Sequence, residues 1–159
     1  MAEEIKNLSM NIVVDDGSRR VPIMNTQGEE IGVFTFRPTD VGIIKRYNEM
    51  VNGFDSIVEP LEAIEGDEGK DIDITDPKYV EALNAAEGRL YEAVNTLFGR
   101  DDAADAFFGK MNPFSPVEGE FYCARVLTAV GQYINGAFDT ETAKFSANAK
   151  KYAKKATRK

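Results

Sequence analysis

The chain has 159 residues, 43% of them hydrophobic, which suits a single domain whose core needs no disulfide or metal. It contains no His and one Cys, which excludes Ser-His-Asp triads, Cys-His pairs and the usual zinc sites and favours a reducing cytoplasm. The net charge of −8 is unevenly divided: residues 1–143 carry 12 basic and 27 acidic side chains, a net −15, whereas residues 144–159 carry seven basic and no acidic ones, a net +7.

Three short segments near the N-terminus have the composition of β-strands: residues 10–14, 20–24 and 31–36. Asp, Asn and Gly residues typical of tight turns connect them. In the third segment Phe34 and Phe36 fall on one face of the strand. We therefore predict that residues 1–38 form a three-stranded antiparallel meander that packs on helices.

The hydrophobic period then changes from 2 to 3.6, which indicates a helix after Pro38. Thr39 is the expected N-cap, with Asp40 in the first turn of the helix. Gly53 and Pro60 interrupt the apolar stripe that follows, and we expect the helix to break near Gly53.

Three further helices complete a predicted helical core over residues 39–138. A capping acid followed by proline, Asp76-Pro77, begins the first of them, and Gly99 is placed to end it. A short helix is predicted over residues 102–108, and the last core helix over residues 121–137.

The acidic segment 65–76 is predicted to be an exposed loop. Calcium binding is the alternative, but no register of this segment matches the order of ligands in an EF-hand. We favour the solvated loop.

Residues 139–159 are rich in Ala, Lys and Ser, and Phe145 and Tyr152 are their only large apolar side chains. We predict a basic, flexible tail that could become helical on a partner. The predicted fold class is thus α+β, mainly α: a short N-terminal antiparallel meander, a helical bundle in the same globular domain, and a basic C-terminal tail.

Catalysis has little support in this sequence. Cys123 lies on a core-like helix without a histidine to act as its base, so we predict that it is buried packing. Neither a Walker pattern nor G-x-G-x-x-G occurs. We expect no enzymatic activity, no cofactor and no metal. No apolar run approaches the length of about 20 residues that crosses a membrane.

The basic tail carries four lysines at i, i+1, i+4 and i+5, which would form one stripe on a helix: Lys150, Lys151, Lys154 and Lys155. Three interpretations remain open. The tail is a solvated end, or it binds the acidic body of a neighbouring copy or another acidic partner, or it contacts nucleic acid. The charge of the body opposes nucleic-acid binding elsewhere on the chain.

Several short motifs occur in order over residues 30–140: FTFRPTD (34–40), RYN (46–48), the helix 90–94 ending in NTLFG (95–99), AFFG (106–109), NPFS (112–115) and the helix from Val130 to Ile134. This order, together with the basic ending, resembles the tail assembly chaperones of long-tailed bacteriophages, particularly those of phages and prophages of Gram-positive hosts.

The resemblance implies a non-catalytic protein of the host cell cytoplasm that binds the long, helical, aggregation-prone tape measure protein and is absent from the mature virion. In many relatives a programmed frameshift adds an extension that recruits tail tube subunits. Self-association, or several copies on one client, is also implied.

Apolar stripes on the predicted helices, together with the lysines of the tail, are the candidate protein-binding residues: Ile43, Ile44, Tyr47, Met50, Leu90, Val94, Leu97, Lys150, Lys151, Lys154 and Lys155. For each apolar position the alternative is ordinary core packing. Two other functions stay open: a structural virion protein, such as a small tail or head–tail connector subunit, and a small host-encoded binding module.

Overall fold

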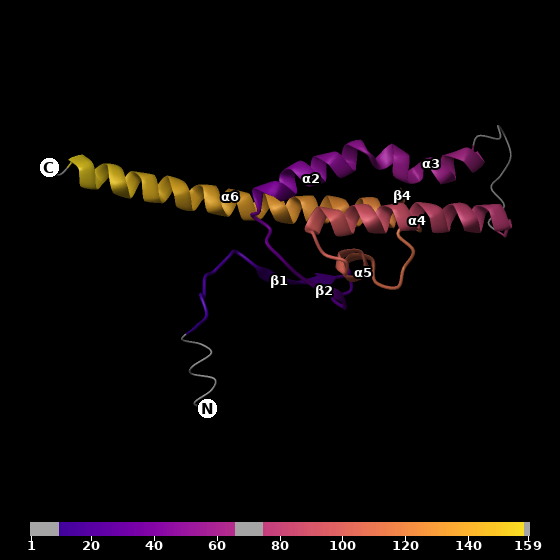
Figure 1. Ribbon diagram of the computed structural model, residues 1–159, viewed down its shortest axis with the longest axis horizontal. Helices are drawn as coiled ribbons and strands as arrows, with labels where there is room; N and C mark the ends of the chain where they lie inside the picture. Colours follow the sequence, from indigo (N-terminus) through magenta and orange to yellow (C-terminus); the bar gives the residue numbers. More distant parts are fainter. Residues whose placement is uncertain (1–9, 66–74, 158–159) are drawn as a thin grey trace, which may run out of the picture.

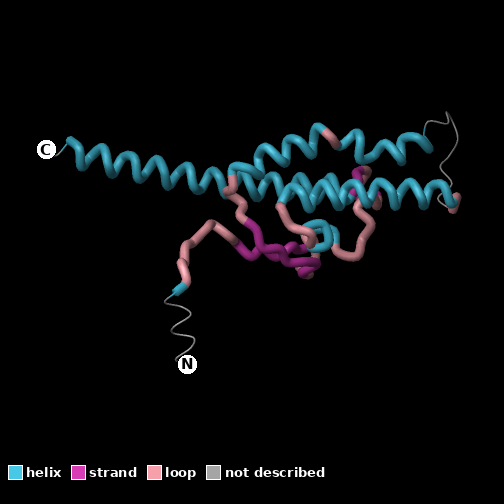
Figure 2. Tube along the Cα trace, viewed as in Figure 1, coloured by secondary structure: helices cyan, strands magenta, loops and turns pink. Residues whose placement is uncertain are grey.

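The computed structural model describes residues 10–65 and 75–157 of the chain. Its elements in chain order are β1 (Arg19–Met24), β2 (Glu30–Phe36), α2 (Val41–Asn52), α3 (Phe54–Glu65), α4 (Pro77–Phe98), α5 (Ala103–Phe108), β3 (Pro116–Val117), β4 (Glu120–Phe121) and α6 (Tyr122–Thr157). Helices predominate and the strands are short (Figure 2). The predicted fold class, α+β and mainly α, is confirmed.

The N-terminal sheet has two strands. β1 and β2 pair antiparallel, with Val21 opposite Phe34 and an irregularity in register between Ile23 and Met24. The predicted third strand, residues 10–14, is wrong: these residues are irregular apart from the helical Met10, and their side chains are exposed. Apolar alternation identified a segment able to form a strand, but a strand also requires a partner edge, which the sequence does not specify.

A cluster of four phenylalanines attaches the sheet to the helices. Phe34 and Phe36 of β2 point to the same side, as the alternation predicted, and both are buried. The ring of Phe34 lies 5.2 Å from that of Phe98 at the end of α4 and 5.1 Å from that of Phe107 in α5. β2 approaches α5 so closely that a Cβ at Gly32 would collide with the carbonyl oxygen of Ala106, which explains the glycine at that position.

α2 and α3 are separated by a single residue, Gly53, which confirms the predicted break. The expected N-cap was wrong by one position. Asp40, rather than Thr39, caps α2, because its Oδ1 accepts a hydrogen bond from the backbone N–H of Gly42 at 2.9 Å. Pro60 lies inside α3 and does not end it.

α4 is the central helix of the body, since α2, α3 and α5 all pack on it. Asp76 caps its start, and Gly99 ends it in the left-handed conformation with φ of 65°, both as predicted. The side chain of Asn95 then joins α4 to α5, because its Oδ1 accepts from the backbone N–H of Ala104 at 2.9 Å. The predicted acidic loop falls mainly on residues 66–74, which lie outside the described residues.

A small hairpin that the sequence did not predict precedes α6. β3 and β4 pair through a two-residue turn in which Glu118 and Gly119 both have positive φ, the geometry of a type I′ turn. α6 then starts one residue after the predicted position, at Tyr122.

α6 does not end near residue 137. It continues as one helix through Thr157, so the described part of the predicted tail is helical rather than irregular. Its first half contributes Cys123, Leu127, Val130 and Ile134 to the core, and its second half projects away from the other elements (Figure 1). The Ala- and Lys-rich composition explains the helix, because both residues have high helix propensity.

Replacing Phe107 by Ala should lower the free energy of unfolding by about 3–5 kcal/mol, because it leaves a cavity inside the aromatic cluster. Chemical denaturation measures this change. Ile12→Ala is the control, since Ile12 is 97% exposed and its loss should change stability by less than about 0.5 kcal/mol. Equal effects of the two variants would contradict this description of the core.

Candidate functional site

The predicted binding residues of α2 have different surroundings. Ile43 and Met50 are buried in the core, and Tyr47 is half-buried, with its hydroxyl donating to the backbone carbonyl of Leu127 at 3.2 Å. Only Ile44 among the α2 candidates is exposed, at 46%. In this structure Ile43, Tyr47 and Met50 hold α2 against the body.

The predicted binding residues of α4 all lie in the interior. Leu90, Val94 and Leu97 are among the most deeply buried side chains of the protein. An amphipathic helix shows which of its faces avoids water but not whether that face meets its own core or a partner. Because α2, α3 and α5 pack on α4, its apolar face meets the core of the same chain.

The predicted basic stripe lies on the last turns of α6. The backbone at Lys150, Lys151, Lys154 and Lys155 is helical. The side chains of these four residues lie outside the part of the chain that the structure describes.

One surface accessible to a partner is a row of exposed apolar side chains on α2, which we call the α2 face: Val41, Ile44 and Val51. They are 73%, 46% and 52% exposed and recur at i, i+3 and i+10, the spacing of one side of a helix. Val41 and Val51 were not among the predicted binding residues, although both follow the helical spacing of the apolar stripe predicted after Pro38. The signal available in the sequence was the width of the apolar stripe on this helix, which is larger than one contact with the core requires.

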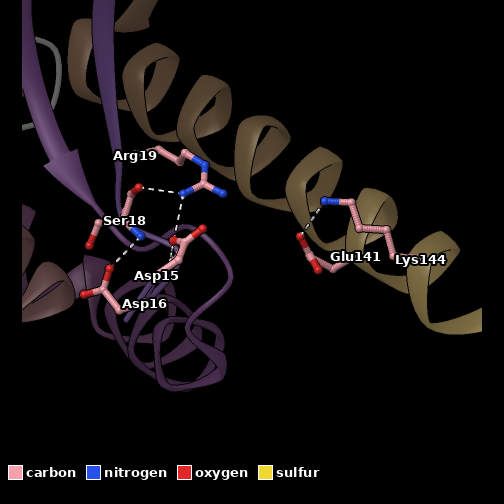
Figure 3. Close-up of polar contacts among 7 residues, drawn as sticks. Asp15, Asp16, Ser18, Arg19, Glu141 and Lys144 are labelled. Atoms are coloured by element: carbon pink, nitrogen blue, oxygen red, sulfur yellow. Dashed lines mark hydrogen bonds and ion pairs between the residues drawn. The ribbon is translucent and has the colours of Figure 1, made fainter. Parts of the chain in front are cut away.

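A second group of exposed apolar residues precedes the sheet. Met10, Ile12, Val13 and Val14 are 75–97% exposed. The chain leaves them through a corner at Asp15 and Asp16, whose carboxylates accept from the backbone N–H groups of Gly17 and Ser18, each at 3.0 Å (Figure 3). The Gly17 N–H is the main cause that lowers the pKa of Asp15, whereas the pKa of Asp16 is lowered first by the side chain of Ser18 and then by its backbone N–H.

Two shallow depressions flank α4. The one between α2 and α4 has a volume of about 320 Å³ and is lined by Arg46, Glu49, Met50, Arg89, Glu92, Ala93, Thr96 and Leu97. The other, of about 600 Å³, lies around the end of α4 at Gly99. Both open to solvent and mix charged with apolar lining, which does not resemble the enclosed apolar cavity typical of a small-molecule site.

An arginine fixes α2 against α4. Nε of Arg46 donates to the carbonyl of Leu97 at 2.7 Å, and its Nη2 lies 3.3 Å from Oδ2 of Asp40. The pKa of Asp40 is lowered, first by the backbone N–H of Gly42 and further by Arg46. We call these two contacts the Arg46 clamp. They give the carbonyl of Leu97 at the end of α4 a hydrogen-bond partner, and they fix the orientation of α2 and of the α2 face.

Asp40→Ala should lower the free energy of unfolding by about 0.5–2 kcal/mol at neutral pH, because α2 loses its cap. The folded pKa lies below the unfolded one, so this contribution is complete above about pH 4 and disappears as the pH falls through the folded value. Asp40→Asn keeps the cap acceptor without the charge and should retain most of the stability with a flatter pH dependence. Denaturation at several pH values measures both variants. If Asp40→Ala has the same free energy of unfolding as the wild type at neutral pH, Asp40 is not the cap of α2.

Cys123 is confirmed as a buried packing residue. It is fully buried, and burial raises the pKa of its thiol to about 11. At pH 8 only about one molecule in a thousand would carry a thiolate. Among the described residues no group of three His, Cys, Asp or Glu side chains could hold a metal ion.

The Cys123 thiol should react with Ellman's reagent at least about a hundredfold more slowly in the native protein than in denaturant. An added exposed cysteine, Ser146→Cys, should react rapidly under native conditions and serves as the control. Native Cys123 reacting as fast as the unfolded chain would refute its burial.

Comparison of the chain with protein-family models, curated proteins and solved structures finds no match. None of the helices that the structure describes combines the length and the apolar content needed to cross a bilayer. The candidate site therefore rests on this molecule's own geometry: an apolar face on α2, held in place by the Arg46 clamp.

Proposed function

We propose that this chain is a phage tail assembly chaperone: a non-catalytic protein of the host cytoplasm that binds the tape measure protein, keeps it soluble during tail assembly, and is absent from the mature virion. The ordered motifs between residues 30 and 140 suggest the family. The α2 face is the observation that carries the binding role.

A long helical client is recognised by apolar side chains that recur at helical spacing and remain accessible. Val41, Ile44 and Val51 meet both conditions, and they lie on an otherwise polar side of α2. The tape measure protein would lay its own apolar stripe against this row, and apolar burial would supply most of the affinity.

The charge of the body supports the same role. A protein with exposed apolar residues tends to associate with its own copies when no client is bound. A net charge of −15 on residues 1–143 opposes indiscriminate association, because like-charged bodies repel one another.

Co-expression with a fragment of the tape measure protein encoded beside this chain, followed by pull-down, tests the proposal. We expect capture of the fragment and an increase in its soluble fraction. Ile44→Glu should reduce capture by about tenfold or more, because it places a charge in the apolar row.

Val80→Glu is the matched control, since Val80 is 47% exposed on α4, outside the α2 face, and its replacement should leave capture unchanged. A fragment that stays insoluble and unbound with the wild-type chain would refute the chaperone role. Detection of the chain in purified virions by mass spectrometry would instead favour a structural virion protein.

A further inference from the structure

The core stripe of α6 continues beyond the body. Val130, Ile134, Phe138 and Phe145 follow one another at spacings of four, four and seven residues, which keeps them on one side of the helix. Val130 and Ile134 are buried and Phe138 is partly buried, whereas Phe145 is 73% exposed. We call residues 139–157 of α6 the arm. Phe145 of the arm thus lies on the side of α6 that is covered within the body, but its own side chain is exposed.

In this structure α2 and α3 of the same chain do not cover the arm (Figure 1). The arm runs on from α6 in one direction, while α2 and α3 run from the same junction in the opposite direction (Figure 1). Within the arm the described ion pair is local, between Glu141 and Lys144 at 3.3 Å (Figure 3). An isolated helix of about five turns is marginal in water, so packing on another molecule would stabilise the arm.

Charge decides which molecule suits the arm. The arm carries five basic and two acidic residues, a net +3, and two more basic residues follow it, so two arms repel each other. Residues 1–138 of a second copy carry 12 basic and 25 acidic residues, a net −13, and attract the arm. The body of a second copy therefore attracts the arm, whereas a second arm repels it. A second copy is also present wherever the chain is expressed.

α2 and α3 of that second copy match the arm in chemistry and in length. The α2 face offers exposed apolar side chains to Phe145. Beyond Val51 the neighbouring helix α3 exposes acids, among them Asp55 and Glu62, where the arm carries its lysines beyond Phe145. α2 and α3 together are about 36 Å long and the arm about 28 Å, from a rise of about 1.5 Å per residue.

We propose that the arm of one copy docks on the α2 face of another, with Phe145 against Ile44 and the basic end of the arm along α3. The two surfaces differ, so every copy can donate one arm and accept another. The contact shares the α2 face with the proposed client site. It goes beyond the proposed function, because the partner is the chain itself and its test contains no client.

Sedimentation velocity of the full chain tests this contact. At low salt the mass should rise with concentration, and high salt should reduce the association, because screening weakens the attraction between arm and body. Phe145→Glu and Ile44→Glu should each weaken association by about tenfold or more. Ala147→Glu adds the same charge two residues along, on the opposite side of the arm, and should have a much smaller effect.

Mixing two single-cysteine variants identifies the contacting surfaces. Phe145→Cys on one copy and Ile44→Cys on another should be joined by a short bis-maleimide, whereas Ala147→Cys with Ile44→Cys should be joined poorly. The native Cys123 is buried and does not compete. A chain that stays monomeric at low salt, or a Phe145→Cys variant that links mainly to itself, would overturn the proposal. Because no client is present, neither result depends on tape measure binding.

Discussion

The packing of four phenylalanine rings is the interaction on which the body depends. Phe34 and Phe36 come from β2, Phe98 from the end of α4 and Phe107 from α5, and Phe98 and Phe107 stack with centroids 5.1 Å apart. A two-stranded sheet is marginal in water by itself, so these rings convert it into a part of the core. The turn at Gly99 is needed for the same reason, since it brings α5 back to the face of the sheet.

Two arginines, Arg100 and Arg46, contact the end of α4 and its connection to α5 from the protein surface. Arg100 forms two hydrogen bonds with Asp102, at 2.9 and 3.1 Å, while its guanidinium lies 5.3 Å from the centre of the Phe34 ring. Arg46 of α2 donates a hydrogen bond to the carbonyl of Leu97 at the end of α4. The exposed Arg100–Asp102 pair adds little stability alone. Its effect is positional, because it holds the connection between α4 and α5 over the aromatic cluster.

α6 combines a core segment and an exposed arm in one helix. Its first half is a core element, and its second half presents the same apolar side to solvent together with a concentrated positive charge. The α2 face presents apolar side chains on an acidic body. The client site and the arm site that we propose require the same chemistry, so under both proposals copies without a client shield one another.

The sequence by itself determined the local structure: the alternation of Phe34 and Phe36, the break at Gly53, and the caps at Asp76 and Gly99. These features depend on neighbours within a few residues. Tertiary structure decided whether residues 10–14 found a strand partner, whether Leu90 and Val94 served the core or a surface, and where the apolar side of α6 lost its cover. Such outcomes depend on which distant segments meet, and hydrophobic periodicity describes one face of one element without naming its partner.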